Sequence, residues 1–160
     1  MRLLALSFAI ILGTTTACAR GPQPIALGDS CNRCHMTVAD ERWGAELITI
    51  TGVIRKYDSV ECLARDVIDE VIPAQDIASL WVVPWDAPGT LVQAQDAIYR
   101  RASAMRGPMG EGIAAFRRES GAQLHSTQSG DSVLNWDEVL ALVSAAPEIP
   151  RHAHEPDRAR

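Results

Sequence analysis

Residues 31–36 read Cys-Asn-Arg-Cys-His-Met and carry the clearest chemical signal in the chain. Two cysteines at CxxC spacing can converge on one metal ion, because the turn between them is tight. Met36 follows Cys34 by two residues, so one loop could aim both sulfur atoms at the same point. Thiolate and thioether are soft ligands that together favour Cu(I), whereas zinc is usually held by Cys and His. The segment predicts a Cu(I) site in which Cys31, Cys34 and Met36 are candidate ligands.

A second methionine pair, Met105 and Met109, lies in the Pro- and Gly-containing segment 103–110. An isolated Met usually fills a hydrophobic core. Met109 stands between Pro108 and Gly110, where a buried helical position is not expected, so it is a further candidate ligand. Met105 is a weaker one and is closer to an ordinary core methionine.

Two other residues are weaker metal-ligand candidates. Cys62 falls in an apolar stripe of helical spacing and is more simply a small buried hydrophobe. His35 follows the second cysteine directly and could add a ligand. No Ser-His-Asp set, phosphate-binding loop or paired-carboxylate motif stands out, so the sequence predicts a binding protein and not an enzyme.

Three rival interpretations use the same cysteines. Cys31, Cys34 and His35 formally match the CxxCH pattern of c-type haem attachment, but the following residues indicate a β-hairpin and not the helices of a small cytochrome. A structural zinc site could form from Cys31, Cys34, Cys62 and a histidine. A thiol-disulfide oxidoreductase would place CxxC at the start of a helix that follows a strand, and here a flexible tether is expected before Cys31.

The elements around these residues follow from local patterns. Residues 45–51 and 53–57 are rich in β-branched side chains and flank Gly52, which favours a hairpin. Residues 58–59 offer a helix N-cap, and apolar side chains then recur at helical spacing. Residues 78–83 indicate a buried strand.

The second half begins after a Pro- and Gly-containing connector and repeats short elements. We expect a strand at 97–101, a turn at 107–108, a strand or helix start at 113–116, a polar helix around 122–128, a strand at 133–135 and a helix at 136–145 capped by Asn135. The predicted division of the chain is 1–17 signal peptide, 18–30 lipidated cysteine and tether, 31–86 first unit, 87–146 second unit and 147–160 disordered tail.

The N-terminus predicts export. Arg2 precedes the apolar run 3–13, which is well short of the ~20 residues that a spanning helix needs. Residues 15–18, Thr-Thr-Ala-Cys, resemble a bacterial lipobox, with Thr15 where Leu is usual, so Cys18 is expected to be acylated. The alternative is plain secretion with cleavage near Ala17. By resemblance to Gram-negative sorting rules, Ala19 favours the outer membrane over the inner one.

The charge balance and the number of cysteines limit the kinds of partner that the sequence predicts. Beyond residue 17 the chain carries 14 basic and 20 acidic side chains, which argues against nucleic acid. If Cys18 is acylated, three cysteines remain: Cys31, Cys34 and Cys62. An odd number in an oxidising compartment leaves at least one thiol unpaired or bound to metal.

This ordered set resembles the NosL family, the accessory lipoproteins of nitrous oxide reductase. It comprises a signal with Cys18, then CxxCxM, then Tyr57-Asp58 with Cys62 on the next helix, and then Gly-Pro-Met-Gly. The resemblance runs from Cys18 to about Val143. It implies an α+β fold of two small related ββαβ-type units packed together after a flexible N-terminal tether.

The resemblance also implies a function and a ligand set. The family is understood to bind Cu(I) and to help supply copper to nitrous oxide reductase, together with envelope assembly machinery. By position, the ligands would be Cys34, Met36 and Met109, with Cys31 as an additional ligand or a redox partner of Cys34. Family members commonly have Gly where this chain has His35.

Overall fold

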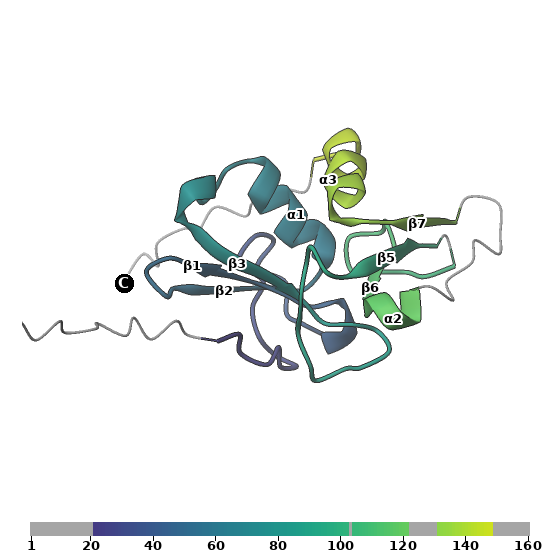
Figure 1. Ribbon diagram of the computed structural model, residues 1–160, viewed down its shortest axis with the longest axis horizontal. Coiled ribbons are helices and arrows are strands. Elements are labelled where there is room, and N and C mark those ends of the chain that lie inside the picture. The colour runs from purple at the N-terminus through teal and green to yellow at the C-terminus, as the bar shows by residue number, and fades with distance from the viewer. Residues whose placement is uncertain (1–20, 103, 122–130, 149–160) are drawn as a thin grey trace, which may run out of the picture.

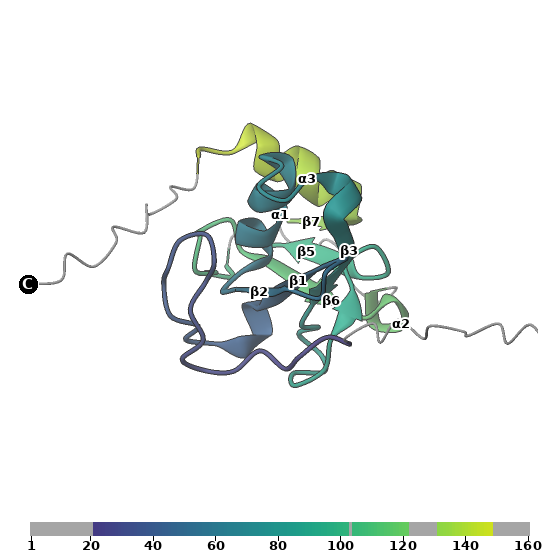
Figure 2. The same ribbon diagram turned by 90° about the vertical axis from the view of Figure 1, so that its left-hand side faces the viewer.

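The computed structural model describes residues 21–102, 104–121 and 131–148. Two small antiparallel sheets lie side by side, and two helices pack against each other over them (Figures 1 and 2). This arrangement confirms the predicted α+β class. Among the described residues, no helix is long and apolar enough to cross a membrane.

The first sheet grows from a hairpin. Strands β1 (Ala45–Thr49) and β2 (Ile54–Tyr57) are antiparallel, and the turn contains Gly52 with φ 80°. That left-handed backbone suits glycine, because it has no Cβ to clash with the chain. Helix α1 (Val60–Ile68) follows, and β3 (Ile77–Val82) returns beside β1. The two-residue strand β4 (Val92–Gln93) completes the order β2-β1-β3-β4 and was not predicted.

The second sheet has three strands, and they are arranged like β2, β1 and β3 of the first sheet. Strand β5 (Ile98–Arg101) lies between β6 (Ile113–Phe116) and β7 (Ser132–Leu134), as β1 lies between β2 and β3. The short helix α2 (Arg118–Gly121) separates β6 from β7 in the chain. The polar helix expected at 122–128 lies outside the described residues.

Helix α3 (Trp136–Ala145) closes the fold with its predicted cap. The Asn135 side chain accepts from the Glu138 amide, and the Glu138 carboxylate accepts from the Asn135 amide. This capping box satisfies amides that a helix start otherwise leaves unpaired.

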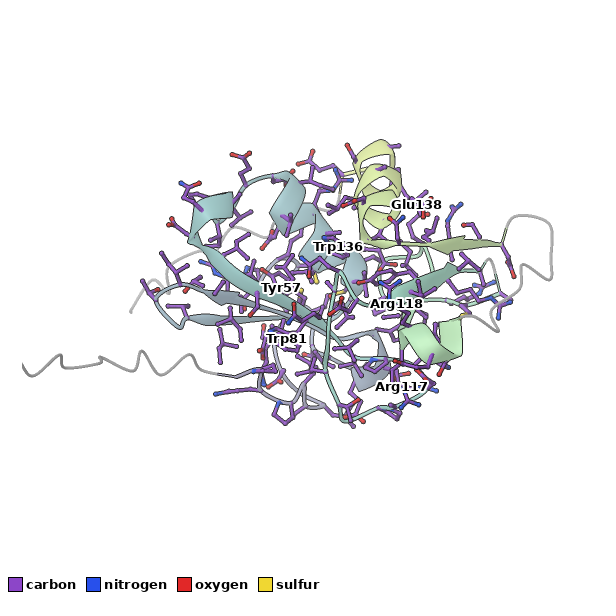
Figure 3. The ribbon with its side chains drawn as sticks, viewed as in Figure 1. Tyr57, Trp81, Arg117, Arg118, Trp136 and Glu138 are labelled. Carbon is purple, nitrogen blue, oxygen red and sulfur yellow. The ribbon has the colours of Figure 1, made fainter. Side chains whose placement is uncertain are left out.

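One hydrophobic core runs beneath both helices and joins the two sheets. It includes Tyr57 from the first unit and Tyr99 and Trp136 from the second. The ring centroids of Tyr99 and Trp136 are 5.9 Å apart. Figure 3 shows Tyr57 and Trp136 in the middle of the molecule, close to the sulfur atoms. The cysteines are therefore held at the junction of the two units.

The segment before Cys31, expected as a tether, is packed over part of its length. Ile25 is buried with Val38 and Val83, and the amide of Gln23 donates to Glu46. Lys56 also forms an ion pair with Asp29 (2.7 Å). These contacts join residues far apart in the sequence, and they place part of 21–30 within the folded region.

Candidate metal centre

The CxxC loop is a closed turn between two antiparallel segments. The Cys31 amide donates to the Met36 carbonyl (2.9 Å), and the His35 amide donates to the Cys31 carbonyl (3.0 Å). An isolated bridge pairs Ser30 with Thr37 just outside the turn. The backbone therefore bends tightly, as the CxxC spacing predicts, but the loop does not start a helix. This geometry does not match the oxidoreductase alternative.

The two residues between the cysteines hold the loop against the first sheet and α1. Asn32 exchanges two hydrogen bonds with the backbone of Lys56 in β2. Arg33, which is completely buried, forms ion pairs with Asp66 (2.7 Å) and Asp69 (2.8 Å) at the C-terminal end of α1. The positions of both cysteines thus depend on the residues between them.

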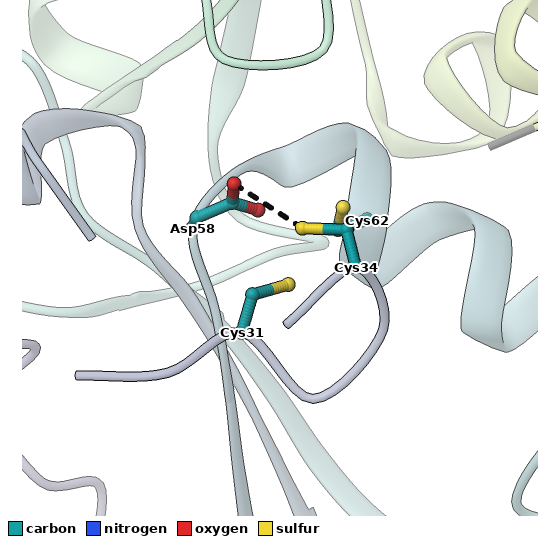
Figure 4. A group of neighbouring side chains, drawn as sticks. All are labelled: Cys31, Cys34, Asp58 and Cys62. Atoms are coloured by element: carbon teal, nitrogen blue, oxygen red, sulfur yellow. Dashed lines mark hydrogen bonds between the residues drawn. The ribbon is translucent and has the colours of Figure 1, made fainter. Parts of the chain in front are cut away.

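Four potential ligand atoms meet at this point. The sulfur atoms of Cys31, Cys34 and Cys62 and a carboxylate oxygen of Asp58 all lie within 4.8 Å of one another (Figure 4). All four residues are buried, and the three cysteines are free thiols. Such a set of soft sulfur ligands fits the binding of a metal ion.

Cys62 and Asp58 reach the cluster through one local junction. Ser59 caps α1 by accepting from the Cys62 amide (3.1 Å), which fixes the first turn of the helix. Asp58 directly precedes this cap, at the end of β2. The sequence indicated Cys62 only as a weaker ligand candidate and did not indicate Asp58 as a ligand. The available signal was the short strand-to-helix junction at residues 58–59, which keeps Asp58 and Cys62 only four positions apart in the sequence.

The thiols do not titrate alike. A hydrogen bond from Cys62 is the largest cause that lowers the pKa of Cys34 to about 7, while desolvation opposes it. The backbone amide of Met36 and the Cys31 thiol also favour the Cys34 thiolate. Hydrogen bonds with Cys31 and Cys34, and then burial, raise the pKa of Cys62. In its thiol form, Cys34 donates to Asp58 Oδ2 at 3.4 Å. Cys34 therefore ionises more readily than Cys62.

The two methionines expected beside the cysteines line one pocket. Met36 and Met109 both border a hollow of about 350 Å³, and Met109 also packs against the core that contains the three cysteines. Met36 is 41 % exposed, so its thioether can meet a partner from solution. The pocket is further lined by Glu61 and Arg65 of α1 and by Ala146, Pro147 and Glu148 at the end of the described chain.

Met105 and His35 lie elsewhere. Met105 packs against a separate cluster of Trp43, Ala114 and Phe116, which is the core role that an isolated methionine usually has. His35 is exposed and has φ 58°, in the left-handed region that favours glycine. The backbone thus explains why glycine is suited to this position.

The c-type haem alternative does not fit this arrangement. Attachment needs both thiols to face a porphyrin, whereas Cys31 and Cys34 are buried beside Cys62 and Asp58. The His35 side chain, which would be the axial ligand, lies at the surface. Three thiols and a carboxylate remain compatible with zinc, which Cys and Asp can ligate.

Comparison with known proteins agrees with the geometry. A sequence model of the NosL family matches residues 22–143. The chain belongs to the NosL family. It is 27 % identical over 151 residues to the copper-binding lipoprotein NosL of Stutzerimonas stutzeri, covering 86 % of this chain and 78 % of the relative.

A solved structure shares the fold. The crystal structure of the copper chaperone NosL from Shewanella denitrificans matches with a TM-score of 0.56 and 22 % identity, over 74 % of this chain and 94 % of that one. One relative is named a copper-binding lipoprotein and the other a copper chaperone, and neither is named as an enzyme.

Proposed function

We propose that this chain is a non-enzymatic Cu(I) carrier of the cell envelope that helps supply copper during maturation of nitrous oxide reductase. The observation that carries the proposal is the buried group of Cys31, Cys34, Cys62 and Asp58, with ligand atoms within 4.8 Å of one another. The copper-binding names of both relatives support it.

Copper is the cargo, and Cys34 is its central ligand. The pKa of Cys34 is lowered to about 7, whereas that of Cys62 is raised, and a thiolate is the form that binds metal. Cys31 and Cys62 can add sulfur ligands from inside, and Met36 and Met109 can add thioethers from the neighbouring pocket. Sulfur ligands of both kinds favour Cu(I) over harder ions.

The difference in exposure between the ligands gives a direction to transfer. Cys31 and Cys62 are completely buried, whereas Met36 is 41 % exposed. An incoming ligand from a partner can displace the thioether first and then the thiolates, so copper passes by ligand exchange without being free. A weak outer ligand on a loop suits a carrier that must also release its cargo.

We also propose the envelope location that the N-terminus indicates. Residues 1–17 act as a signal peptide, and acylated Cys18 anchors the chain facing the periplasm, in the outer membrane. The relative from Stutzerimonas stutzeri, whose name includes the word lipoprotein, supports the anchor. Cys18 itself lies outside the described residues.

Anaerobic titration of the reduced protein with Cu(I), against a chromophoric Cu(I) chelator, tests the carrier function. We expect about one tightly held copper per chain, and Cys34→Ser should lose most of the affinity. Cys18→Ser is the matched control, because it should abolish acylation without changing the affinity for copper. A protein that takes no copper from the chelator contradicts the proposal.

Structural zinc is the second candidate, favoured by the carboxylate in the thiol cluster. The same protein is therefore titrated with Zn(II) before Cu(I) is added. Displacement of zinc by one equivalent of Cu(I) supports the carrier. Retention of zinc in the presence of excess Cu(I) supports the structural site instead.

A further inference from the structure

The turn between β1 and β2 exposes apolar side chains at one end of the first sheet. Ile50 is 62 % exposed and Val53 53 % exposed, and they flank Thr51 and Gly52 at the tip. A polar turn would be the ordinary choice for a hairpin in water. Two large β-branched side chains at a tip therefore indicate a surface that is covered when the protein works.

The surface beside the tip is hollow, and it is uncharged on the side of Gln23, whereas Arg55 and Asp76 border the tip in a second hollow. A pocket of about 670 Å³ lies between the tip, the start of β3 and Gln23. None of its lining residues carries a charge, although 22 % of the chain is Asp, Glu, Lys or Arg. Removing an uncharged apolar tip from water avoids the large desolvation cost of an ionised side chain.

The anchor brings a specific occupant to this surface. Gln23 lines the pocket, and Cys18 lies only five residues before it. At about 3.5 Å per residue, an extended segment of that length spans at most ~18 Å. An acyl group on Cys18 therefore keeps Gln23 within about that distance of the bilayer, and the tip lines the same pocket as Gln23.

We propose that the tip formed by residues 50–53 inserts into the surface of the bilayer that holds acylated Cys18. This inference rests on the lipid anchor of the proposed function. Tethering converts the contact into an intramolecular one at millimolar effective concentration, so a small apolar tip is sufficient. The acyl chains hold the protein at the membrane, and the tip sets its orientation.

The orientation has a consequence for the copper site. The tip lies beyond the Ile48–Ile54 pair of the hairpin, whereas Asp58 and Cys62 follow the Ala45–Tyr57 pair at the other end. These pairs are three residues apart, or roughly 10 Å along the strands. Figure 1 shows the β1–β2 turn and the second sheet at opposite ends of the molecule. A docked tip therefore directs the thiol cluster away from the lipid and towards soluble partners.

Photo-cross-linking of the full-length acylated protein in vesicles of phosphatidylethanolamine and phosphatidylglycerol tests the inference. A benzophenone amino acid replaces Ile50, Val53 or Val133, one at a time. Val133 is the matched control, because it is an exposed apolar residue (38 %) on β7 in the second sheet. All three positions are at the surface, so the substitutions should leave the fold intact.

We expect lipid adducts at positions 50 and 53 in roughly tenfold higher yield than at 133, as tethered insertion requires. Equal yields at all three positions overturn the inference, as do adducts with a second copy of the chain or with its own N-terminal segment. Flotation of the vesicles distinguishes failure of the lipid anchor from failure of the tip to dock. If the protein does not float, the lipid anchor fails and the docking fails with it. If it floats and binds copper without tip adducts, only the docking is wrong.

Discussion

Arg33 Nη1 lies 2.7 Å from Asp66 Oδ1, and both side chains are almost completely buried. Arg33 stands between the two cysteines of the CxxC loop, while Asp66 is in the last turns of α1 and also accepts from the Tyr57 hydroxyl (3.1 Å). One buried ion pair therefore connects the CxxC loop to the helix that carries Cys62. The pair positions two parts of the thiol cluster relative to each other.

Replacing Arg33 by Met should destabilise both the fold and the metal centre. Removing one partner of a buried pair leaves the other charge uncompensated and costs about 3–5 kcal/mol. We expect a loss in this range in chemical denaturation and weaker Cu(I) binding, because the loop loses its hold on α1.

The matched control for this change is Arg117→Met. The Arg117 side chain is 48 % exposed in its pair with Asp86, and such surface pairs contribute at most about 1 kcal/mol. If Arg33→Met unfolds at the same denaturant concentration as the wild type, the buried pair is not the link that we describe.

Replacement of Met109 and replacement of Met105 should have different effects on copper affinity. Met109 lines the pocket that Met36 also borders, whereas Met105 packs against Trp43 and Phe116. Met109→Ala should weaken Cu(I) binding by about tenfold or more, since even residues behind the direct ligands act on that scale. Met109→Ala should also lower stability somewhat, because Met109 packs against the core, but the variant should still fold.

Met105→Ala serves as the comparison, since it should leave copper affinity unchanged while lowering stability. Truncation of a fully buried Met costs about 2–5 kcal/mol, and partial burial should give the lower part of that range. Chelator competition and thermal unfolding measured on both variants separate the two roles. Wild-type affinity in Met109→Ala would remove Met109 from the site.

Much of the fold was predictable because its signals are local. The hairpin around Gly52, the N-cap at Ser59 and the Asn135 cap each depend on a few neighbouring residues. Strand β4 was missed because two residues carry no periodicity. The packing of Ile25 was also missed, since its partners Val38 and Val83 are distant in the sequence.

The residues of the candidate site were likewise predictable only where they are close together in the sequence. Spacing alone indicated Cys31, Cys34 and Met36, because they share one loop. Cys62 had the pattern of a buried apolar residue, and it is completely buried, yet its sulfur faces the other thiols. Asp58 was noted at the helix cap and in the family resemblance, but no spacing indicated it as a metal ligand. Convergence of β2, α1 and the loop brings these residues together, and single-sequence reasoning does not reveal such tertiary contacts.

The pH dependence of copper loading should follow Cys34. Its pKa of about 7 means that protons compete with Cu(I) as pH falls below 7, so affinity should drop by up to about tenfold per pH unit there. Because the Cys62 hydrogen bond is the largest cause of the lowered pKa, Cys62→Ala should shift the ionisation of Cys34 to higher pH. Ultraviolet thiolate absorbance of the reduced, metal-free protein measures this shift, and an unchanged titration would contradict the assignment.

Glu61 should make the stability of the metal-free protein depend on pH. Burial raises the pKa of Glu61 to about 7, and Oε2 has no hydrogen-bond partner among the described residues, while Oε1 accepts from the Ile113 amide (3.4 Å). The folded state therefore binds the proton more tightly than the unfolded chain, where the pKa is near 4.5. The resulting stabilisation is fully present below pH 4.5 and is lost as pH rises through 7.

Glu61→Gln removes this titration while keeping an oxygen for the Ile113 amide. The free energy of unfolding of the variant, minus that of the wild type, should increase by about 3 kcal/mol between pH 4.5 and pH 8, since one pKa unit corresponds to about 1.4 kcal/mol. Urea unfolding of both proteins across this range measures the difference, and groups common to both cancel. Glu119→Gln is the control, because that carboxylate is exposed and the variant should follow the wild-type curve. A constant difference for Glu61→Gln would mean that water or a rearranged side chain solvates the carboxylate, and the pocket beside Met109 would then be wetter than its contacts indicate.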